Sequence, residues 1–173
     1  MVLCCVSAFL VVYARRDVVG KEPRSALIVP TLYLIGDSTV RNGKGDGANG
    51  QWGWGEPLVE YFDSRKISVI NSALGGRSSR TYITGGQWER VRSQLRNGDF
   101  VIIQFGHNDS SAINDDSRAR GTIRGTGEES ERIDNLLTHE PEVVHSFGWY
   151  MRRYVRETRE KGRQEKSAVT WKG

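Results

Sequence analysis

The chain has 173 residues, with 25 Lys and Arg against 21 Asp and Glu, 37% hydrophobic residues and 20 Gly. This length suits one domain with a buried core, and the composition excludes a disordered or collagen-like chain. No apolar run approaches the roughly 20 residues that span a bilayer, so no membrane span is expected. The excess positive charge lies after Met151, in a tail rather than on a folded face, which argues against nucleic acid as a partner.

The N-terminal segment is apolar. Residues 2–14 carry no charged side chain, and an Arg-Arg-Asp sequence ends the run. The length fits the core of a signal peptide, and Val12-Tyr13-Ala14 is an acceptable cleavage site. We therefore predict a signal peptide over residues 1–14 and a secreted or extracytoplasmic protein, with a buried N-terminal strand or a misassigned start codon as the alternatives. Because Cys4 and Cys5 lie in this run, a processed chain would have no disulfide.

Three short apolar runs predict strands. They are residues 31–35, 67–70 and 100–105, and the third is apolar almost throughout, as in strands buried on both faces. Residues 42–55 between the first two runs predict a Gly-rich loop. Its Gly45–Gly50 sequence matches G-x-G-x-x-G but begins well beyond the strand end, so we do not expect a dinucleotide site.

Apolar residues at helical spacing predict three helices. The first begins at Glu56 and Pro57, the second ends at Gly98, and the third reaches about Lys161. Their buried faces would be formed by Leu58, Tyr61 and Phe62; by Trp88, Val91 and Leu95; and by Val143, Phe147, Tyr150, Met151, Tyr154 and Val155. Strands and helices alternate, which predicts an α/β fold with a parallel sheet.

The C-terminal part is less regular. The polar stretch over residues 110–142 predicts a long loop with one helical turn near residues 133–137. Residues 163–173 form an atypical basic tail. The alternation calls for a strand there, but no apolar run supplies one.

Polar sequences follow directly on each predicted strand: Gly36-Asp37-Ser38, the segment 71–78, and Gly106–Asp109. Because the carboxyl ends of parallel strands meet at one edge of the sheet, these three sequences should converge. Ser38 offers a hydroxyl, Gly76 a backbone N–H without a side chain in the way, and Asn108 an amide NH₂. A nucleophile surrounded by N–H donors is what acyl transfer requires.

Gly36-Asp37-Ser38-Thr39, Gly76-Arg77-Ser78 and Gly106-His107-Asn108-Asp109 resemble the first three sequence blocks of the SGNH (GDSL-type) hydrolases. The longer segments 71–82 and 117–150 resemble the rhamnogalacturonan acetylesterase branch of that family. The resemblance covers residues 31–162, which we interpret as the hydrolase domain. It implies a flavodoxin-like three-layer sandwich with a parallel sheet in the order 2-1-3-4-5.

The resemblance also implies roles for four residues. Ser38 would be the nucleophile, and its N–H, the Gly76 N–H and the Asn108 side chain would bind the oxyanion, while Asp37 would hold the nucleophile loop. The implied activity is a serine esterase that removes acetyl groups from a plant cell-wall polysaccharide, or hydrolyses a small ester, without a metal or cofactor.

One block of the family pattern is not found. The family base is a His preceded by an Asp three residues earlier, whereas this chain has only His107, His139 and His145 and no D-x-x-H after the third block. We therefore expect an incomplete domain without strands four and five, in which residues 100–105 form an open, aggregation-prone edge. An inactive scaffold that binds carbohydrate is the alternative function.

Four further residues are candidates for substrate binding. Arg77 and Arg80 would be suited to meet the carboxylates of a pectic substrate, with solvated or structural arginines as the alternative. Trp52 and Trp54 in the Gly-rich loop would be suited to stack on a sugar ring, with a role in the aromatic core as the alternative.

Overall fold

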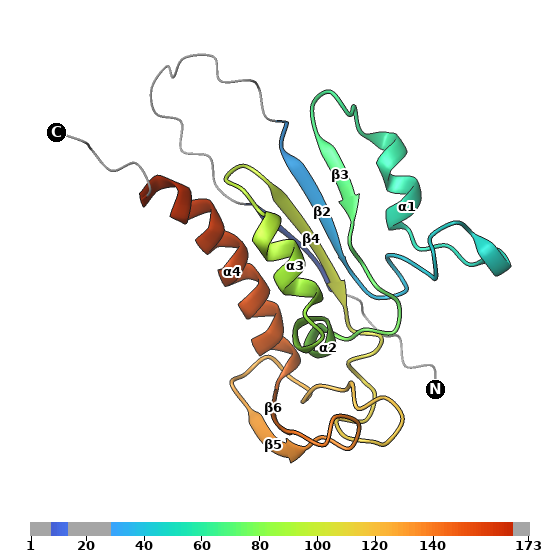
Figure 1. Ribbon diagram of the computed structural model, residues 1–173, viewed down its shortest axis with the longest axis vertical. Helices are drawn as coiled ribbons and strands as arrows, with labels where there is room; N and C mark the ends of the chain where they lie inside the picture. Colours follow the sequence, from blue (N-terminus) through green and yellow to red (C-terminus); the bar gives the residue numbers. More distant parts are fainter. Residues whose placement is uncertain (1–7, 14–28, 168–173) are drawn as a thin grey trace.

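A four-stranded sheet forms the centre of the protein (Figure 1). The structure, a computed structural model, describes residues 8–13 and 29–167. Strands β2 (Thr31–Gly36), β3 (Ser68–Asn71) and β4 (Phe100–Phe105) coincide with the three predicted runs. β2 lies between β3 and β4 and is parallel to both, as the 2-1-3 part of the expected order requires.

The fourth strand comes from the N-terminal apolar run. β1 (Ala8–Tyr13) pairs with β4 in antiparallel orientation, from Ala8 opposite Phe105 to Tyr13 opposite Phe100. The expectation that β4 would be an open edge is therefore wrong, because β1 occupies that edge. Cleavage after residue 14 stays a prediction, and both cysteines lie outside the described residues.

Helices cover the sheet unequally. Figure 1 shows α2 (Ser79–Thr84), α3 (Gln87–Gln94) and α4 (Phe147–Ser167) together over one side of the sheet. The short helix α1 (Gly55–Leu58) lies near β3 and continues into a 3₁₀ turn, η2 (Val59–Tyr61). Another 3₁₀ turn, η1 (Ala48–Gly50), lies within the Gly-rich loop.

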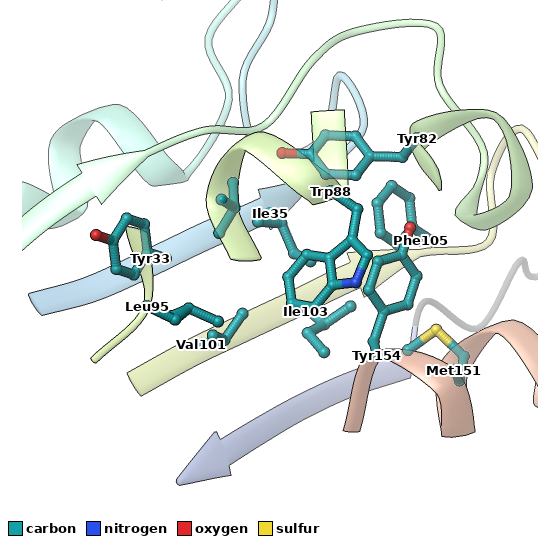
Figure 2. Close-up of a cluster of buried hydrophobic side chains, with 11 residues drawn as sticks. Tyr33, Ile35, Tyr82, Trp88, Leu95, Val101, Ile103, Phe105, Met151 and Tyr154 are labelled. Atoms are coloured by element: carbon teal, nitrogen blue, oxygen red, sulfur yellow. The ribbon is translucent and has the colours of Figure 1, made fainter. Parts of the chain in front are cut away.

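The core has two parts because strand side chains point alternately to opposite faces of the sheet. In β2, Tyr33 and Ile35 face one cluster, whereas Leu32 and Leu34 face the other. Figure 2 shows the first cluster, in which Trp88 of α3 packs edge-on against Tyr154 of α4 with ring centroids 4.9 Å apart. These two clusters on either side of the sheet give the expected layered α/β fold.

Several predicted elements differ from the structure. The first helix is much shorter than predicted, and Tyr61 is 83% exposed rather than buried. Helix α2 was not predicted, because its buried residues include the polar Ser79 and Arg80. Helix α4 begins at Phe147 and extends beyond Lys161, to Ser167.

The predicted long loop contains a β-hairpin. β5 (Ser130–Asp134) pairs with β6 (Pro141–His145), so Val143 belongs to a strand and is half exposed. The predicted helical turn is wrong because Asn135 forms a tight turn, its Oδ1 accepting the N–H groups of Leu137 and Thr138. Figure 1 shows the hairpin at the end of the molecule towards which β2 and β4 point.

Candidate active site

Ser38 lies in a tight turn directly after β2. The buried Asp37 accepts two hydrogen bonds at Oδ1, from the Thr39 N–H at 2.9 Å and the Thr39 hydroxyl at 2.8 Å. Its carbonyl accepts the N–H groups of Val40 and Arg41. Asp37 therefore fixes the turn that carries Ser38, which remains partly exposed.

The chain after β3 runs alongside this turn. The N–H of Leu74 donates to the carbonyl of Gly36 at 3.0 Å, which continues the β2–β3 pairing past the end of the strands. A Cβ built on Gly75 would lie 3.6 Å from the Cβ of Ser38, so Gly75 and Ser38 are direct neighbours. Gly76 is exposed and has φ +78°, a conformation that glycine adopts without strain.

Asn108 connects the third sequence to the second. It is 3% exposed, and its Nδ2 donates to the carbonyl of Arg77 at 2.7 Å. The three polar sequences thus converge at the carboxyl ends of parallel strands, as the sheet topology predicted.

Asp109 holds the loop that carries Asn108. Its buried carboxylate accepts the N–H groups of Ser79 and Gly106 and the Ser79 hydroxyl. Burial raises its pKa, although the hydrogen bonds from Ser79 and Gly106 act in the opposite direction. Asp109 was not predicted as a site residue, although its place in the third sequence block was a signal that could have identified it.

Arg80 is not available to a substrate. It is fully buried, and its guanidinium donates to both oxygens of Glu142 and to the carbonyls of Ile113 and Gly121. This corrects the expectation that Arg80 meets a substrate carboxylate, because all of these bonds tie α2 to the loop and hairpin below it.

Arg77 and Trp54 occupy different environments. Arg77 is partly buried and lines a pocket of about 410 Å³ together with Thr81, Arg118 and Asn135. Trp54 packs against the second core cluster, and its Nε1 donates to Oε1 of Gln104. The exposed aromatic residue of the Gly-rich loop is Trp52, which is 61% exposed.

A family model described as GDSL-like lipase/acylhydrolase matches residues 32–149. The chain belongs to this family. The matched region contains Ser38, Gly76 and Asn108 and ends in the first turn of α4.

Two relatives of this GDSL-like chain connect it with acetylesterases. It is 32% identical over 124 residues to the rhamnogalacturonan acetylesterase of Emericella nidulans, a match that covers 72% of this chain and 45% of that protein. It is 42% identical over 80 residues to the probable rhamnogalacturonan acetylesterase YesY of Bacillus subtilis, covering 46% of this chain and 36% of that protein. The chain thus spans less than half the length of these relatives.

A solved structure confirms the fold class. The crystal structure of YxiM from Bacillus subtilis matches with a TM-score of 0.53 and 25% identity. The match covers 82% of this chain and 33% of that one. The predicted α/β fold with a parallel sheet is therefore that of an SGNH hydrolase.

The three histidines of this GDSL-like chain are not hydrogen-bonded to Ser38. His107 and His139 are exposed, in the loop after β4 and in the hairpin turn. His145 stacks on Trp149 with ring centroids 3.8 Å apart, and burial lowers its pKa. No hydrogen bond of the Ser38 hydroxyl is found among the residues that the structure describes.

Within residues 8–13 and 29–167, no group of three or more His, Cys, Asp or Glu side chains is placed to hold a metal ion. In the same part of the chain, no helix has the length and apolar character needed to cross a bilayer.

Proposed function

We propose that this chain is a serine esterase that removes acetyl groups from a rhamnogalacturonan-like polysaccharide through an acyl-Ser38 intermediate. The observation that carries the proposal is the convergence of Ser38, Gly76 and Asn108 at the carboxyl ends of β2, β3 and β4. The type of substrate rests on the two acetylesterase relatives.

In the proposed reaction, the Ser38 hydroxyl oxygen attacks the acetyl carbonyl carbon. The N–H groups of Ser38 and Gly76 and the Asn108 side chain donate to the oxygen that becomes negative. The bond between the acetyl carbon and the sugar oxygen then breaks, and the sugar oxygen takes up the proton that Ser38 has lost. Water afterwards hydrolyses the acetyl-Ser38 ester to acetate and free Ser38. Asp37 supports this role by fixing the turn that presents Ser38.

The proton of Ser38 requires a base. His107 follows Gly106 in the same loop as Asn108, and His145 lies at the end of β6. These two residues are the first to substitute by Ala once Ser38-dependent turnover has been measured.

The test is acetate release from acetylated rhamnogalacturonan by the chain, by Ser38→Ala and by Ser93→Ala. Ser93 is an exposed serine of α3 and serves as the matched control. Loss of a catalytic serine lowers turnover on the order of a millionfold, so Ser38→Ala should release no acetate while Ser93→Ala equals the parent. Thermal melting must show that all three are folded. Equal release by Ser38→Ala would contradict the proposal.

A second candidate is a carbohydrate-binding protein without turnover. It is favoured by the absence of a histidine partner for Ser38 among the described residues. Binding of the polysaccharide by calorimetry, with no acetate release from a folded chain, would support this candidate over the esterase.

A further inference from the structure

Arg120 contacts the loop that carries the proposed oxyanion donor. Its Nη1 donates to the carbonyl of Gly76 at 3.1 Å, and its Nε donates to the hydroxyl of Ser111 at 3.2 Å. Asn108 meanwhile binds the next carbonyl, that of Arg77. Two side chains of the segment between β4 and β5 thus hold two successive carbonyl groups, which fixes the backbone directly after the Gly76 Cα. Gly76 itself has φ +78°.

A preformed turn delivers Arg120 to this position. The carboxylate of Asp115 accepts hydrogen bonds from three successive backbone N–H groups and one hydroxyl, and these bonds hold its pKa well below the usual range. The donors are the N–H and hydroxyl of Ser117 and the N–H groups of Arg118 and Ala119. Ala119 is buried with φ +40°, an uncommon conformation outside glycine, so the turn has one specific geometry.

The turn is also anchored after Arg120. The N–H of Gly121 donates to the carbonyl of Ala112 at 2.8 Å, and a Cβ on Gly121 would overlap the carbonyl of Ser111. Arg120 is therefore held on both sides, and its guanidinium does not need to be ordered when a ligand binds.

The positive charge of Arg120 interacts with charged groups of the site. Burial lowers its pKa, and Arg118 lowers it further, while Asp115, Asp37 and Asp109 act in the opposite direction. An arginine remains protonated in proteins, so it supplies a fixed positive charge beside Gly76. A fixed positive charge near the point where negative charge develops stabilises that negative charge without reorganisation.

We propose that Arg120 is a positioning residue of the ester site: it fixes the peptide group after Gly76, and so restricts the backbone conformation that directs the Gly76 N–H, and its charge favours a tetrahedral anion beside that N–H. The inference rests on the proposed function for the role of Gly76. Its test uses an anion-binding measurement as well as turnover, so that the two proposals fail separately.

The first experiment measures binding of methylphosphonate, a tetrahedral anion, to the full chain. The chemical shift of the Gly76 ¹H–¹⁵N resonance reports the binding. Arg120→Ala should raise the Kd for methylphosphonate about tenfold. This effect is smaller than the loss of a hundredfold or more that follows removal of an oxyanion donor itself. Arg120→Lys should retain part of the affinity. Arg132→Ala, which removes an exposed arginine of β5, is the matched control and should bind as the parent does.

The turnover arm uses 4-nitrophenyl acetate. Arg120→Ala should lower the Ser38-dependent kcat about tenfold with little change in KM, and added guanidinium should restore part of it. A residue that only stabilises the fold would change the melting temperature but would show no rescue by guanidinium. If Arg120→Ala does not fold, Arg120→Lys is used in both the binding and the turnover measurements.

Equal methylphosphonate affinity in the parent and Arg120→Ala, or no shift of Gly76 in the parent, would overturn the inference. A weakened Kd in Arg120→Ala with hydrolysis that does not depend on Ser38 would leave the inference standing and reject the esterase proposal.

Discussion

Gly36 and Gly75 both border Ser38, but they tolerate a side chain differently. A Cβ on Gly36 would overlap the carbonyl of Gln104 and the side chain of Val40, where neighbouring backbones are already paired. A Cβ on Gly75 would make ordinary contact, 3.6 Å from the Cβ of Ser38. Neither residue has a positive φ, so the difference between them is one of space.

We therefore predict opposite outcomes for Gly36→Ala and Gly75→Ala. Gly36→Ala should lower the free energy of unfolding by about 3 kcal/mol, because backbone atoms must move apart. Gly75→Ala should change it by less than about 1 kcal/mol. Its methyl group should instead reduce Ser38-dependent turnover on the order of tenfold or more, by displacing the substrate. Urea denaturation and acetate release separate the two effects, and equal stability of both variants would show that the Gly36 contact is not tight.

Among the elements, those that bury an apolar face were predictable from the sequence. β2, β4 and α3 each carry closely spaced large apolar residues that the core requires, such as Ile35, Ile103 and Trp88. The β5–β6 hairpin was not predictable, because Ile133 and Val144 are its only buried apolar residues and its turn depends on the Asn135 side chain. The convergence of Ser38, Gly76 and Asn108 followed from parallel strand order, which does not depend on loop details.

Arg120 shows the limit of the same reasoning. Its contact with Gly76 depends on the geometry of a turn built on Asp115, and no periodicity in the sequence encodes that geometry. Arg80 was misassigned for a related reason, since only the fold shows that Glu142 is its partner.

The Arg80–Glu142 pair connects α2 to the hairpin and should make this connection sensitive to pH. Burial alone would raise the pKa of Glu142, but hydrogen bonds from Arg80 and Asn135 and the charge of Arg80 lower it below the ordinary 4.5. A carboxyl group with a lowered pKa stabilises the fold above its unfolded pKa, and the stabilisation is lost as pH falls through the folded pKa.

Glu142→Gln should therefore lower the free energy of unfolding by about 2 kcal/mol near neutral pH. The loss is smaller than for breaking a fully buried ion pair, because Glu142 is partly exposed. The difference from the parent should shrink as pH falls from about 7 to about 3. Glu89→Gln, which removes an exposed partner of Arg92, is the control and should have little effect. Urea denaturation across this range is the measurement, and a constant difference would show that Glu142 does not titrate with its pair.

At the scale of the whole molecule, β1 determines whether the sheet has an exposed long edge. The residues of β1 lie within the predicted signal peptide, so the same segment is predicted to be removed and is seen to pair with β4. Without β1, every second residue of β4 would present an unpaired N–H and C=O on that side, and apolar strand edges of this kind associate with other chains.

We predict that a chain starting at Arg15 associates in a concentration-dependent way, whereas the 173-residue chain remains monomeric. Removing β1 should also lower the Tm by roughly 5 °C, because the β1–β4 ladder is lost. Light scattering after size exclusion measures the association, and hydrogen exchange should be faster at the β4 amides of the shorter chain. Substituting Cys4→Ser and Cys5→Ser in the longer chain controls for disulfide formation. A monomeric shorter chain with unchanged β4 exchange would mean that β1 does not protect this edge in solution.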